Sequence, residues 1–240
     1  MYPIVASCRP RLQARRLHQP FTMIRAVLLD VDGTLVDSND AHARAWIEAF
    51  AEFGRSVPFE RVRPLIGKGG DKLMPEASGL DSESPEGKRI DERRGEIFKE
   101  RYLPKLEPFP RAAELLAHLR SDGFRLVVAT SAKEEEMDAL LEICGGSRLV
   151  DARTSSDDAD QSKPDGDIIA AALTRAGAAP HEALMLGDTP YDVEAAGRVG
   201  VRTVAVRSGG WDDAALAGAV AIYGDASELL DRYGESPFKR

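Results

Sequence analysis

Residues 25–38 read RAVLLDVDGTLVDS, an apolar run that ends in two aspartates two positions apart. The run lacks polar–apolar alternation, which is typical of a strand buried on both faces of a parallel sheet. Alternate residues of an extended chain point the same way, so Asp30 and Asp32 are expected to face one pocket while Val31 faces the core. Carboxylates at the edge of a core cost free energy unless something pairs with them. This strand end is therefore the first candidate site.

Further apolar runs of this kind follow along the chain. RLVVA ends at Ala129, ALMLG at Gly187 and VRTVAV at Val206, and weaker candidates are LVDART from Leu149 and AVAIY from Ala219. Segments with helical periodicity lie between the runs, such as the apolar stripe within residues 112–119. Strands that alternate with helices predict an α/β fold with a doubly wound, mainly parallel, Rossmann-like sheet.

The connection after the first strand is too long for a simple crossover. Asp37 or Ser38 is expected to cap the helix that begins it. Many more residues precede the second strand than the ~30 that a whole βαβ unit needs. We therefore expect an inserted helical cap over residues 38–106, with the core formed by residues 23–37 and 107–240. Such an insertion lies at the carboxyl end of a strand, where open α/β sheets bind ligands.

The composition is that of an ordinary globular protein. The chain has 240 residues, of which 43% are hydrophobic and 30% charged, and its net charge is −8. The negative charge argues against a broad surface for nucleic acid or an anionic membrane. No apolar run approaches the ~20 residues that span a bilayer. Residues 1–22 carry four arginines and no acid, and their apolar part is too short for a signal peptide. We expect a disordered N-terminal extension there and a cytoplasmic protein.

A second pair of acids lies in LMLGDTPYD. Asp188 comes directly after an apolar run, and Thr189-Pro190 opens a helix with Asp192 in its first turn. The carboxyl ends of parallel strands meet at one edge of the sheet, so Asp30 and Asp188 converge and repel each other unless a cation lies between them. Mg²⁺ is expected there, because it takes oxygen ligands and keeps positions open for a substrate phosphate. Asp192 either orients a metal-bound water or is a solvated first-turn acid.

Two further segments have features of an anion site. In VVATSAK, Thr130 and Ser131 lie between a strand and a helix, where hydroxyls and amides form either an anion site or an ordinary helix cap. In SKPDGD, Lys163 lies in a polar loop and is suited to neutralise a phosphate and the acid at position 30. An isolated lysine is more often a solvated surface charge.

Together, these segments resemble the haloacid dehalogenase-like hydrolase superfamily, in its phosphatase branch with a helical cap similar to that of phosphoglycolate phosphatases and β-phosphoglucomutases. The four motifs appear as DVDGTLVDS, ATS, KPDGD and GDTPYD, in this order along the chain. The resemblance extends from Ile24 to the last predicted strand and helix. Gly166 departs from the family pattern, which usually has proline at that position.

The resemblance implies a phosphatase that works through a covalent intermediate. Asp30 would attack phosphorus and form an aspartyl phosphate, and Asp32 would protonate the leaving oxygen and then activate water. Thr130 and Lys163 would hold the phosphoryl oxygens, with Ser131 beside them.

The same resemblance implies a metal site and a class of substrate. The Asp30 carboxylate, the Asp32 backbone carbonyl and the Asp188 carboxylate would bind Mg²⁺, and Asp192 is included in the expected metal site. The expected partner is a small phosphorylated metabolite, and the expected assembly is a monomer or a homodimer.

Within this family, two activities compete. The acid at Asp32 favours phosphate esters over haloacids, since only an alkoxide leaving group needs a proton. HARAW, which begins at His42, resembles a segment of the mutases, but related phosphatases also carry a histidine there, and His42 also suits the edge of the apolar stripe of the cap. The loop IGKGGDKLM contains Lys68 but lacks the arginine by which mutases grip a second phosphate, which favours a hydrolase. His42 and Lys68 are the candidate substrate contacts of the cap.

These motifs do not identify the substrate. Lys68, Lys72 and Arg63 are candidates for binding a second anionic group, although each also suits a solvated surface. From a different class, the chain could be a phospho-receiver or a non-catalytic metal-binding module. Receivers carry no large insertion before their second strand, and a degenerate relative would be expected to lose one of the four motif residues.

Overall fold

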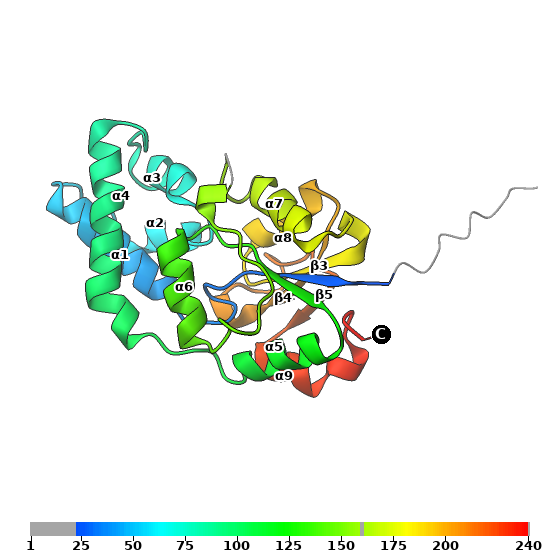
Figure 1. Cartoon of the computed structure of the whole chain (residues 1–240). Coiled ribbons are helices and arrows are strands. Elements are labelled where there is room, and N and C mark those ends of the chain that lie inside the picture. Colours follow the sequence, from blue (N-terminus) through cyan, green and yellow to red (C-terminus); the bar gives the residue numbers. More distant parts are fainter. Residues whose placement is uncertain (1–22, 159–160, 240) are drawn as a thin grey trace, which may run out of the picture.

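Five parallel strands form the centre of the molecule (Figure 1). The structure, a computed structural model, describes residues 23–158 and 161–239, so the expectation for residues 1–22 falls outside it. The strands lie in the order β2-β1-β3-β4-β5. Their bounds are Ala26–Leu29 for β1, Arg125–Val128 for β2, Ala183–Gly187 for β3, Arg202–Val206 for β4 and Ala221–Tyr223 for β5. The predicted α/β fold with a parallel sheet is confirmed.

One predicted strand is wrong. The segment from Leu149 runs beside β2, and Ala152 and Val128 are joined by a backbone hydrogen bond of 3.0 Å. Only an isolated bridge between Val127 and Ala152 forms there, instead of a strand. The backbone amide of Leu126 donates to the side chain of Asp151, so a side chain takes one place in the pairing.

Helices cover both faces of the sheet (Figure 1). Val27 and Leu29 of β1 pack into one cluster with α5 and α9, and Ala26 and Leu28 pack into another with α7 and α8. This alternation follows from the period of two in a strand. The bounds are Ala112–Ser121 for α5, Glu134–Ile143 for α6, Asp167–Ala176 for α7, Pro190–Arg198 for α8 and Ala226–Asp231 for α9.

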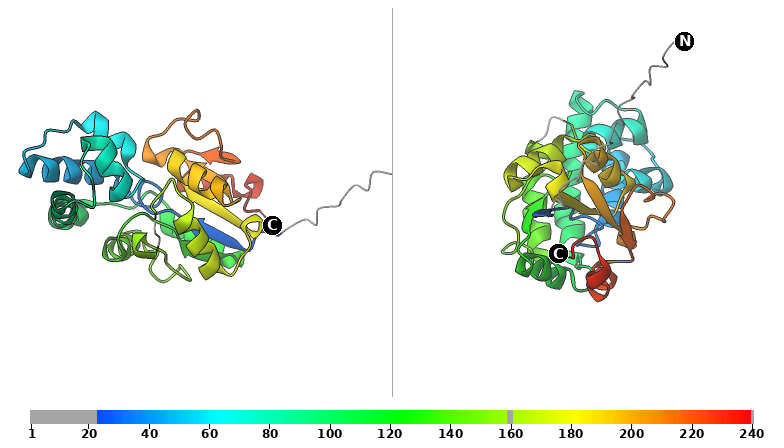
Figure 2. Two further views of the ribbon diagram at one scale, coloured as in Figure 1. Left: turned by 90° about the horizontal axis from the view of Figure 1, so that it is seen from above. Right: turned by 90° about the vertical axis from the view of Figure 1, so that its right-hand side faces the viewer.

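The long connection after β1 is helical. Its elements are α1 Asn39–Glu52, α2 Phe59–Val62, α3 Gly70–Ser78, α4 Pro85–Ile97 and the π-helical turn η2 Phe98–Tyr102. Figures 1 and 2 show these helices grouped beyond one end of the sheet, not on its faces. Trp46 and Phe50 of α1 are buried, and α4 carries many charged residues.

Short helical turns complete the described chain. They are η1 Arg63–Leu65, η3 Leu103–Lys105, η4 Ser156–Asp158, η5 Pro180–Glu182, η6 Arg207–Gly209 and η7 Tyr233–Glu235. Among the described residues, none of the helices combines the length and the apolar character needed to cross a bilayer.

Candidate active site

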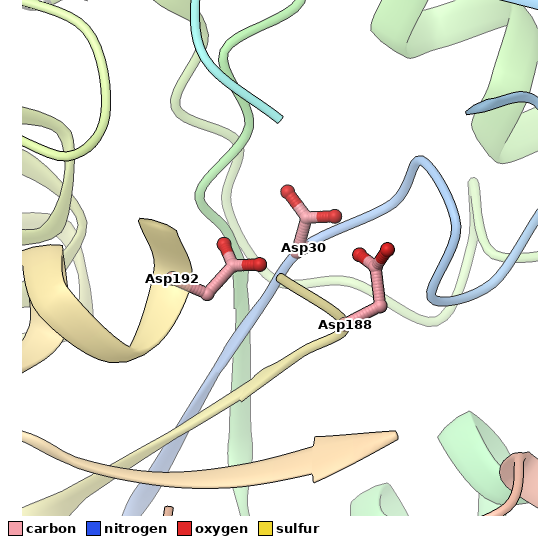
Figure 3. Close-up of side chains that lie close together, drawn as sticks. All are labelled: Asp30, Asp188 and Asp192. Atoms are coloured by element: carbon pink, nitrogen blue, oxygen red, sulfur yellow. The ribbon is translucent and has the colours of Figure 1, made fainter. Parts of the chain in front are cut away.

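Three buried aspartates meet at the carboxyl ends of the strands. Asp30 follows β1, Asp188 follows β3, and Asp192 lies in the first turn of α8. One carboxylate oxygen from each lies within 4.8 Å of the others, and Figure 3 shows the three side chains close together. Asp30 and Asp188 therefore lie close together at one edge of the sheet, as predicted.

Asp32 has a separate set of partners. The hydroxyl of Ser38 donates to Asp32 Oδ1 at 2.5 Å, and His42 Nε2 lies 2.8 Å from the same oxygen. The His42 ring stacks on Phe98 of the cap, with their centroids 3.9 Å apart. Ser38 stands at the N-cap position of α1, as expected, but its side chain makes no capping hydrogen bond there and donates to Asp32 instead.

The pKa values of the two acids after β1 move in opposite directions. Burial raises the pKa of Asp30 well above its usual range, and the charges of Asp192 and Asp188 add to the rise, although Lys163 opposes it. Burial also pushes the pKa of Asp32 upward, but the charge of His42 and the hydrogen bonds from His42 and Ser38 outweigh it and leave this pKa below its usual value. Positive charge beside Asp30 is therefore needed to keep it ionised, whereas His42 and Ser38 already favour the ionised form of Asp32.

Asp188 is held by two side chains that sequence reasoning missed. Thr34 Oγ1 donates to Asp188 Oδ1 at 3.0 Å, and Asn39 Nδ2 donates to Oδ2 at 3.0 Å. Thr34 also lies 3.3 Å from Asp30 Oδ2. Burial and the charge of Asp192 raise the pKa of Asp188 to about 7, although the hydrogen bonds from Asn39 and Thr34 oppose the rise. Thr34 lies in the DVDGT segment, and its position in this motif is the sequence feature that could have identified it as a site residue.

Asp192 is fixed by the start of its own helix. Its Oδ2 accepts from the backbone amide of Thr189 at 3.0 Å and from the Thr189 hydroxyl at 2.7 Å. The amide of Asp192 in turn donates to the Thr189 hydroxyl at 3.2 Å, which completes a capping box. Asp192 Oδ1 is left to face the cluster.

Lys163 is the cation of this cluster. Its ammonium lies 2.6 Å from Asp30 Oδ1 and 2.7 Å from Asp192 Oδ1, and its side chain is only 1% exposed. Burial alone would lower the pKa of Lys163, but the charges of Asp192 and Asp30 raise it. The alternative of a solvated surface lysine is wrong.

The charges of the cluster do not balance. Three buried carboxylates share one ammonium, so full ionisation leaves two negative charges without a counter-ion. Burial raises the pKa values of Asp30 and Asp188, and the repulsion among the carboxylates adds to the rise. A divalent cation with a preference for oxygen ligands would cancel it, and the residues present therefore fit Mg²⁺.

Thr130 and Ser131 follow β2 and line the same cavity as Asp30. Thr130 is buried, and its hydroxyl accepts from the amide of Ala132 at 3.1 Å. The Ser131 hydroxyl donates to the backbone oxygen of Gly67 in the cap at 3.2 Å. Helix α6 begins only at Glu134, so neither residue stands at the N-cap of a helix.

A cavity opens between these residues and the cap. With its mouth it holds about 490 Å³ of empty space, and Asp30, Asp32, His42 and Thr130 line it. A second, open cavity, of about 990 Å³ with the solvent at its mouth, adjoins it and shares Gly69, Gly70, Arg94 and Ser131 with the first. The candidate catalytic groups therefore line an open cavity.

The cap cations predicted to meet an anion are all in ion pairs. Lys68 lines the first cavity, but its ammonium lies 2.6 Å from Glu76. Lys72 lies 3.1 Å from Asp165, and Arg63 Nε lies 2.6 Å from Asp40. Two charged residues that line the cavity were not among the candidates. They are Arg94 and Glu136.

Residues 27–206 match a family model described as haloacid dehalogenase-like hydrolase. A phosphoglycolate phosphatase of Caulobacter vibrioides is 31% identical over 187 residues, which cover 76% of this chain and 79% of that protein. The chloroplastic protein SUPPRESSOR OF QUENCHING 1 of Arabidopsis thaliana is 31% identical over 194 residues. This alignment covers 77% of the chain but 18% of the Arabidopsis protein, so the chain corresponds to a part of that longer protein.

Solved structures share the whole fold. A hydrolase from Pseudomonas syringae superposes with a TM-score of 0.80 at 28% identity, over 88% of this chain and 98% of that one. A candidate β-phosphoglucomutase from Bacteroides vulgatus superposes with a TM-score of 0.77 at 28% identity, over 88% of each chain. Both activities that the motifs suggest are therefore represented among the similar proteins.

Proposed function

The chain belongs to the haloacid dehalogenase-like hydrolase family, and on that premise we propose that it hydrolyses small-molecule phosphate monoesters through an aspartyl phosphate on Asp30, with Mg²⁺ as cofactor. Membership of a hydrolase family decides against a phospho-receiver or a non-catalytic metal-binding module. The observation that carries the proposal is the buried contact of Lys163 with Asp30 within a cluster of three aspartates that opens onto a cavity.

Asp30 is the proposed nucleophile. A carboxylate oxygen of Asp30 forms a bond to phosphorus while the bond from phosphorus to the ester oxygen breaks. Lys163, which contacts the same carboxylate, and Thr130, at the adjoining strand end, would bind the phosphoryl oxygens as charge moves onto them. Ser131 lies next to Thr130 on the cavity wall and is a further proposed contact.

Asp32 is the proposed acid and base. The leaving oxygen takes a proton from the Asp32–His42 pair, and Asp32 then accepts a proton from the water that attacks phosphorus and releases Asp30. His42 Nε2 and Asp32 share one hydrogen bond of 2.8 Å, so His42 positions Asp32. The lowered pKa of Asp32 favours its ionised form, which is the form that can accept this proton.

Mg²⁺ would be held by the carboxylates of Asp30 and Asp188 and by the backbone carbonyl of Asp32. When bound, it would supply positive charge against the phosphoryl group and relieve the repulsion among the acids. Asp192 belongs to the same cluster, where Lys163 and Thr189 hold its two oxygens.

We further propose that residues 38–106 form a cap that selects the leaving group and that residues 23–37 and 107–240 form the catalytic core. Support comes from the cavity, whose lining draws on both parts. Lys68 faces that cavity from the cap, and we retain it as a proposed contact at its edge. We expect a cytoplasmic monomer or homodimer.

Phosphate release tests this proposal. Wild-type protein and Asp30→Asn would be assayed with and without Mg²⁺ over glycolate, sugar, polyol and nucleotide phosphates. We expect turnover that needs Mg²⁺ and is lost in the variant. Absence of phosphate release from every ester, with the protein folded, would contradict it.

A mutase is the second candidate, because a candidate β-phosphoglucomutase shares the fold at 28% identity. Conversion of glucose 1-phosphate to glucose 6-phosphate, without release of phosphate, would favour it over the hydrolase.

A further inference from the structure

Two helices of the cap form a ladder of contacts that leads away from Asp32. On the first rung, His42 of α1 stacks on Phe98 with a centroid distance of 3.9 Å. On the second rung, the guanidinium of Arg94 lies 5.3 Å from the ring centroid of Trp46. His42 and Trp46 are four residues apart in α1, and Arg94 and Phe98 are four residues apart on the facing helical segment. Each of these separations is about one helical turn, or ~5.4 Å. Arg94 therefore lies about one helical turn from His42, the partner of the proposed acid, and it lines the same cavity as Asp32.

Arg94 is bound to a carboxylate of the core. Its Nη1 donates to both oxygens of Glu136 in α6, at 2.9 and 2.8 Å. The side chain of Arg94 is 9% exposed and that of Glu136 is 1% exposed. Both residues line the first cavity. A buried pair of this kind joins the cap to the core at the point where the leaving group must fit.

The pair leaves hydrogen-bonding capacity unused. A guanidinium has five N–H donors, and two bonds to Glu136 involve one nitrogen. Nη2 lies 3.6 Å from Asp91, beyond hydrogen-bond range, and Nε has no partner among the described residues. Glu136 keeps lone pairs on both oxygens. Nε itself is buried, but Arg94 and Glu136 both line the cavity, so the guanidinium and the carboxylate lie next to each other in its wall.

The positive charges of the two cavities are already matched. Within the described residues, each lysine or arginine that lines either cavity has a carboxylate partner within 4 Å: Lys68 with Glu76, Lys88 with Glu83, Arg94 with Glu136 and Lys133 with Asp91. The pairs at Lys88 and Lys133 are exposed and weak, but Glu136 is buried and cannot be screened by water. A second anionic group on the substrate would meet an Arg94 whose charge is already neutralised.

We propose that Arg94 and Glu136 are specificity-determining residues that select phosphate esters of uncharged, hydroxylated alcohols, such as glycerol or sugar monophosphates, over esters that carry a carboxylate or a second phosphate. This inference rests on the proposed phosphatase activity. A hydroxyl accepts a hydrogen bond from the guanidinium and donates one to the carboxylate, so it uses both groups. A carboxylate on the substrate uses only the guanidinium and is repelled by Glu136.

Two substrates of equal length test the proposal. Glycerol 3-phosphate and 3-phosphoglycerate differ by one terminal group, a hydroxymethyl in the first and a carboxylate in the second. We expect wild-type kcat/KM to be at least about tenfold higher for glycerol 3-phosphate, the effect of one charged hydrogen bond. A preference for 3-phosphoglycerate or 2-phosphoglycolate would overturn the proposal, while the loss of all Mg²⁺-dependent phosphate release would overturn the proposed function instead.

Variants of the pair give a second, directional readout. Glu136→Gln frees the charge of Arg94 and is expected to reduce the ratio of the two kcat/KM values at least about tenfold, mainly through a lower KM for 3-phosphoglycerate. Arg94→Gln leaves the negative charge and is expected to raise the ratio. If the pair were merely structural, each variant would change kcat/KM for the two substrates by the same factor.

The control is the neighbouring residue Glu135, whose side chain is 78% exposed and pairs with Lys99. Glu135→Gln should leave the ratio unchanged. If Glu136→Gln fails to fold, because Arg94 is left buried without its partner, the double variant Arg94→Gln/Glu136→Gln restores neutrality. Because it lacks both charges, its two kcat/KM values should be much closer to each other than those of the wild type, and an unchanged wild-type preference in this variant would contradict the proposal.

Discussion

At the scale of single residues, the protonation of Asp188 makes the stability of the protein depend on pH. Its pKa in the folded protein is about 7, well above the usual value of ~3.9 for aspartate. The folded protein therefore holds a proton that the unfolded chain releases between these two values. This group contributes stability at low pH that is lost as the pH rises to about 7.

We predict that Mg²⁺ stabilises the protein more at pH 8 than at pH 6. Its ligands must be ionised, so Mg²⁺ competes with the proton on Asp188, and the apparent Kd should weaken roughly tenfold for each pH unit below 7. Thermal unfolding with and without Mg²⁺ at the two pH values measures this effect. An equal increase in Tm at both values would contradict the assignment, and Asp188→Asn should remove the increase.

Lys163→Met is predicted to abolish phosphatase activity and to lower the free energy of unfolding by about 3–5 kcal/mol in the absence of Mg²⁺. The substitution leaves Asp30 and Asp192 buried without their shared cation. Urea unfolding measures the loss. Lys99→Met is the control, because Lys99 pairs with the exposed Glu135 and should cost at most about 1 kcal/mol. Equal losses in the two variants would be inconsistent with the charge cluster.

The sequence predicts which acids meet but not what holds them. Asp30 and Asp188 follow apolar strands, so their convergence follows from the parallel sheet. Asn39 was not predictable as a partner of Asp188, since its position depends on how the cap helix α1 leaves the turn. Arg94 and Glu136 lie on different helices of cap and core, and nothing in their local sequence indicates that they meet.

At the scale of elements, the ends of β3 and α8 set the position of Asp192. Gly187 ends β3, and a Cβ built on it would lie 2.6 Å from Asp192 Cγ. Gly197, in the same helix as Asp192, has no atom within 4 Å of such a Cβ among the described residues, and it is exposed. The two glycines therefore serve different purposes.

We predict that Gly187→Ala displaces Asp192 and lowers kcat at least about tenfold, while Gly197→Ala raises the free energy of unfolding by about 0.5–1 kcal/mol and leaves kcat unchanged. Phosphate release and urea unfolding of the two variants measure both effects. If Gly187→Ala were as active as wild type, close packing against Asp192 would not matter for the reaction.

The strands and most helices were predictable because their apolar periodicity is uninterrupted. The segment from Leu149 also contains apolar residues, but the side chain of Asp151 accepts a hydrogen bond from the backbone of β2. Only a single β-bridge forms between this segment and β2. Ser38 stands at the N-cap position of α1, but its hydroxyl donates to Asp32 instead of to the helix. In both cases a polar side chain had a choice of partners that only the tertiary structure settles.

At the scale of the whole molecule, polar contacts join the helical insertion to the core at several places besides the Arg94–Glu136 pair. The hydroxyl of Tyr191 in α8 donates to the backbone oxygen of Pro64 at 2.6 Å. Burial raises the pKa of Tyr191 to about 12, so the hydroxyl keeps its proton and remains a donor at neutral pH. Arg63 Nη2 donates to the backbone oxygen of Gly209 at 2.7 Å nearby.

Tyr191→Phe is predicted to raise KM a few-fold with little change in kcat, because the missing bond of about 0.5–1.5 kcal/mol loosens the cap over the cavity. Steady-state kinetics and hydrogen exchange at residues 63–68 measure it. Tyr102→Phe is the control, because Tyr102 bonds to Glu48 within the helical insertion and its loss should leave KM unchanged. Equal changes in KM for both variants would argue against a role for this contact.

The existence of a helical insertion was predictable from the length of the connection after β1, but the chemistry of its inner face was not. That face depends on which cap side chains reach the core, and the cations first considered, Lys68, Lys72 and Arg63, all have partners of their own. The choice of substrate is therefore a property of the assembled molecule.

The covalent intermediate on Asp30 is the central claim, and pre-steady-state kinetics of Asp32→Asn with p-nitrophenyl phosphate and Mg²⁺ test it most directly. The aryl oxygen leaves without a proton, so the first step should survive the variant, while the attack of water should be slow. We predict a burst of one p-nitrophenolate per enzyme and a phosphoryl group that mass spectrometry of the quenched protein places on Asp30. A rapid steady state without a burst, or a phosphoryl group on another residue, would contradict the account.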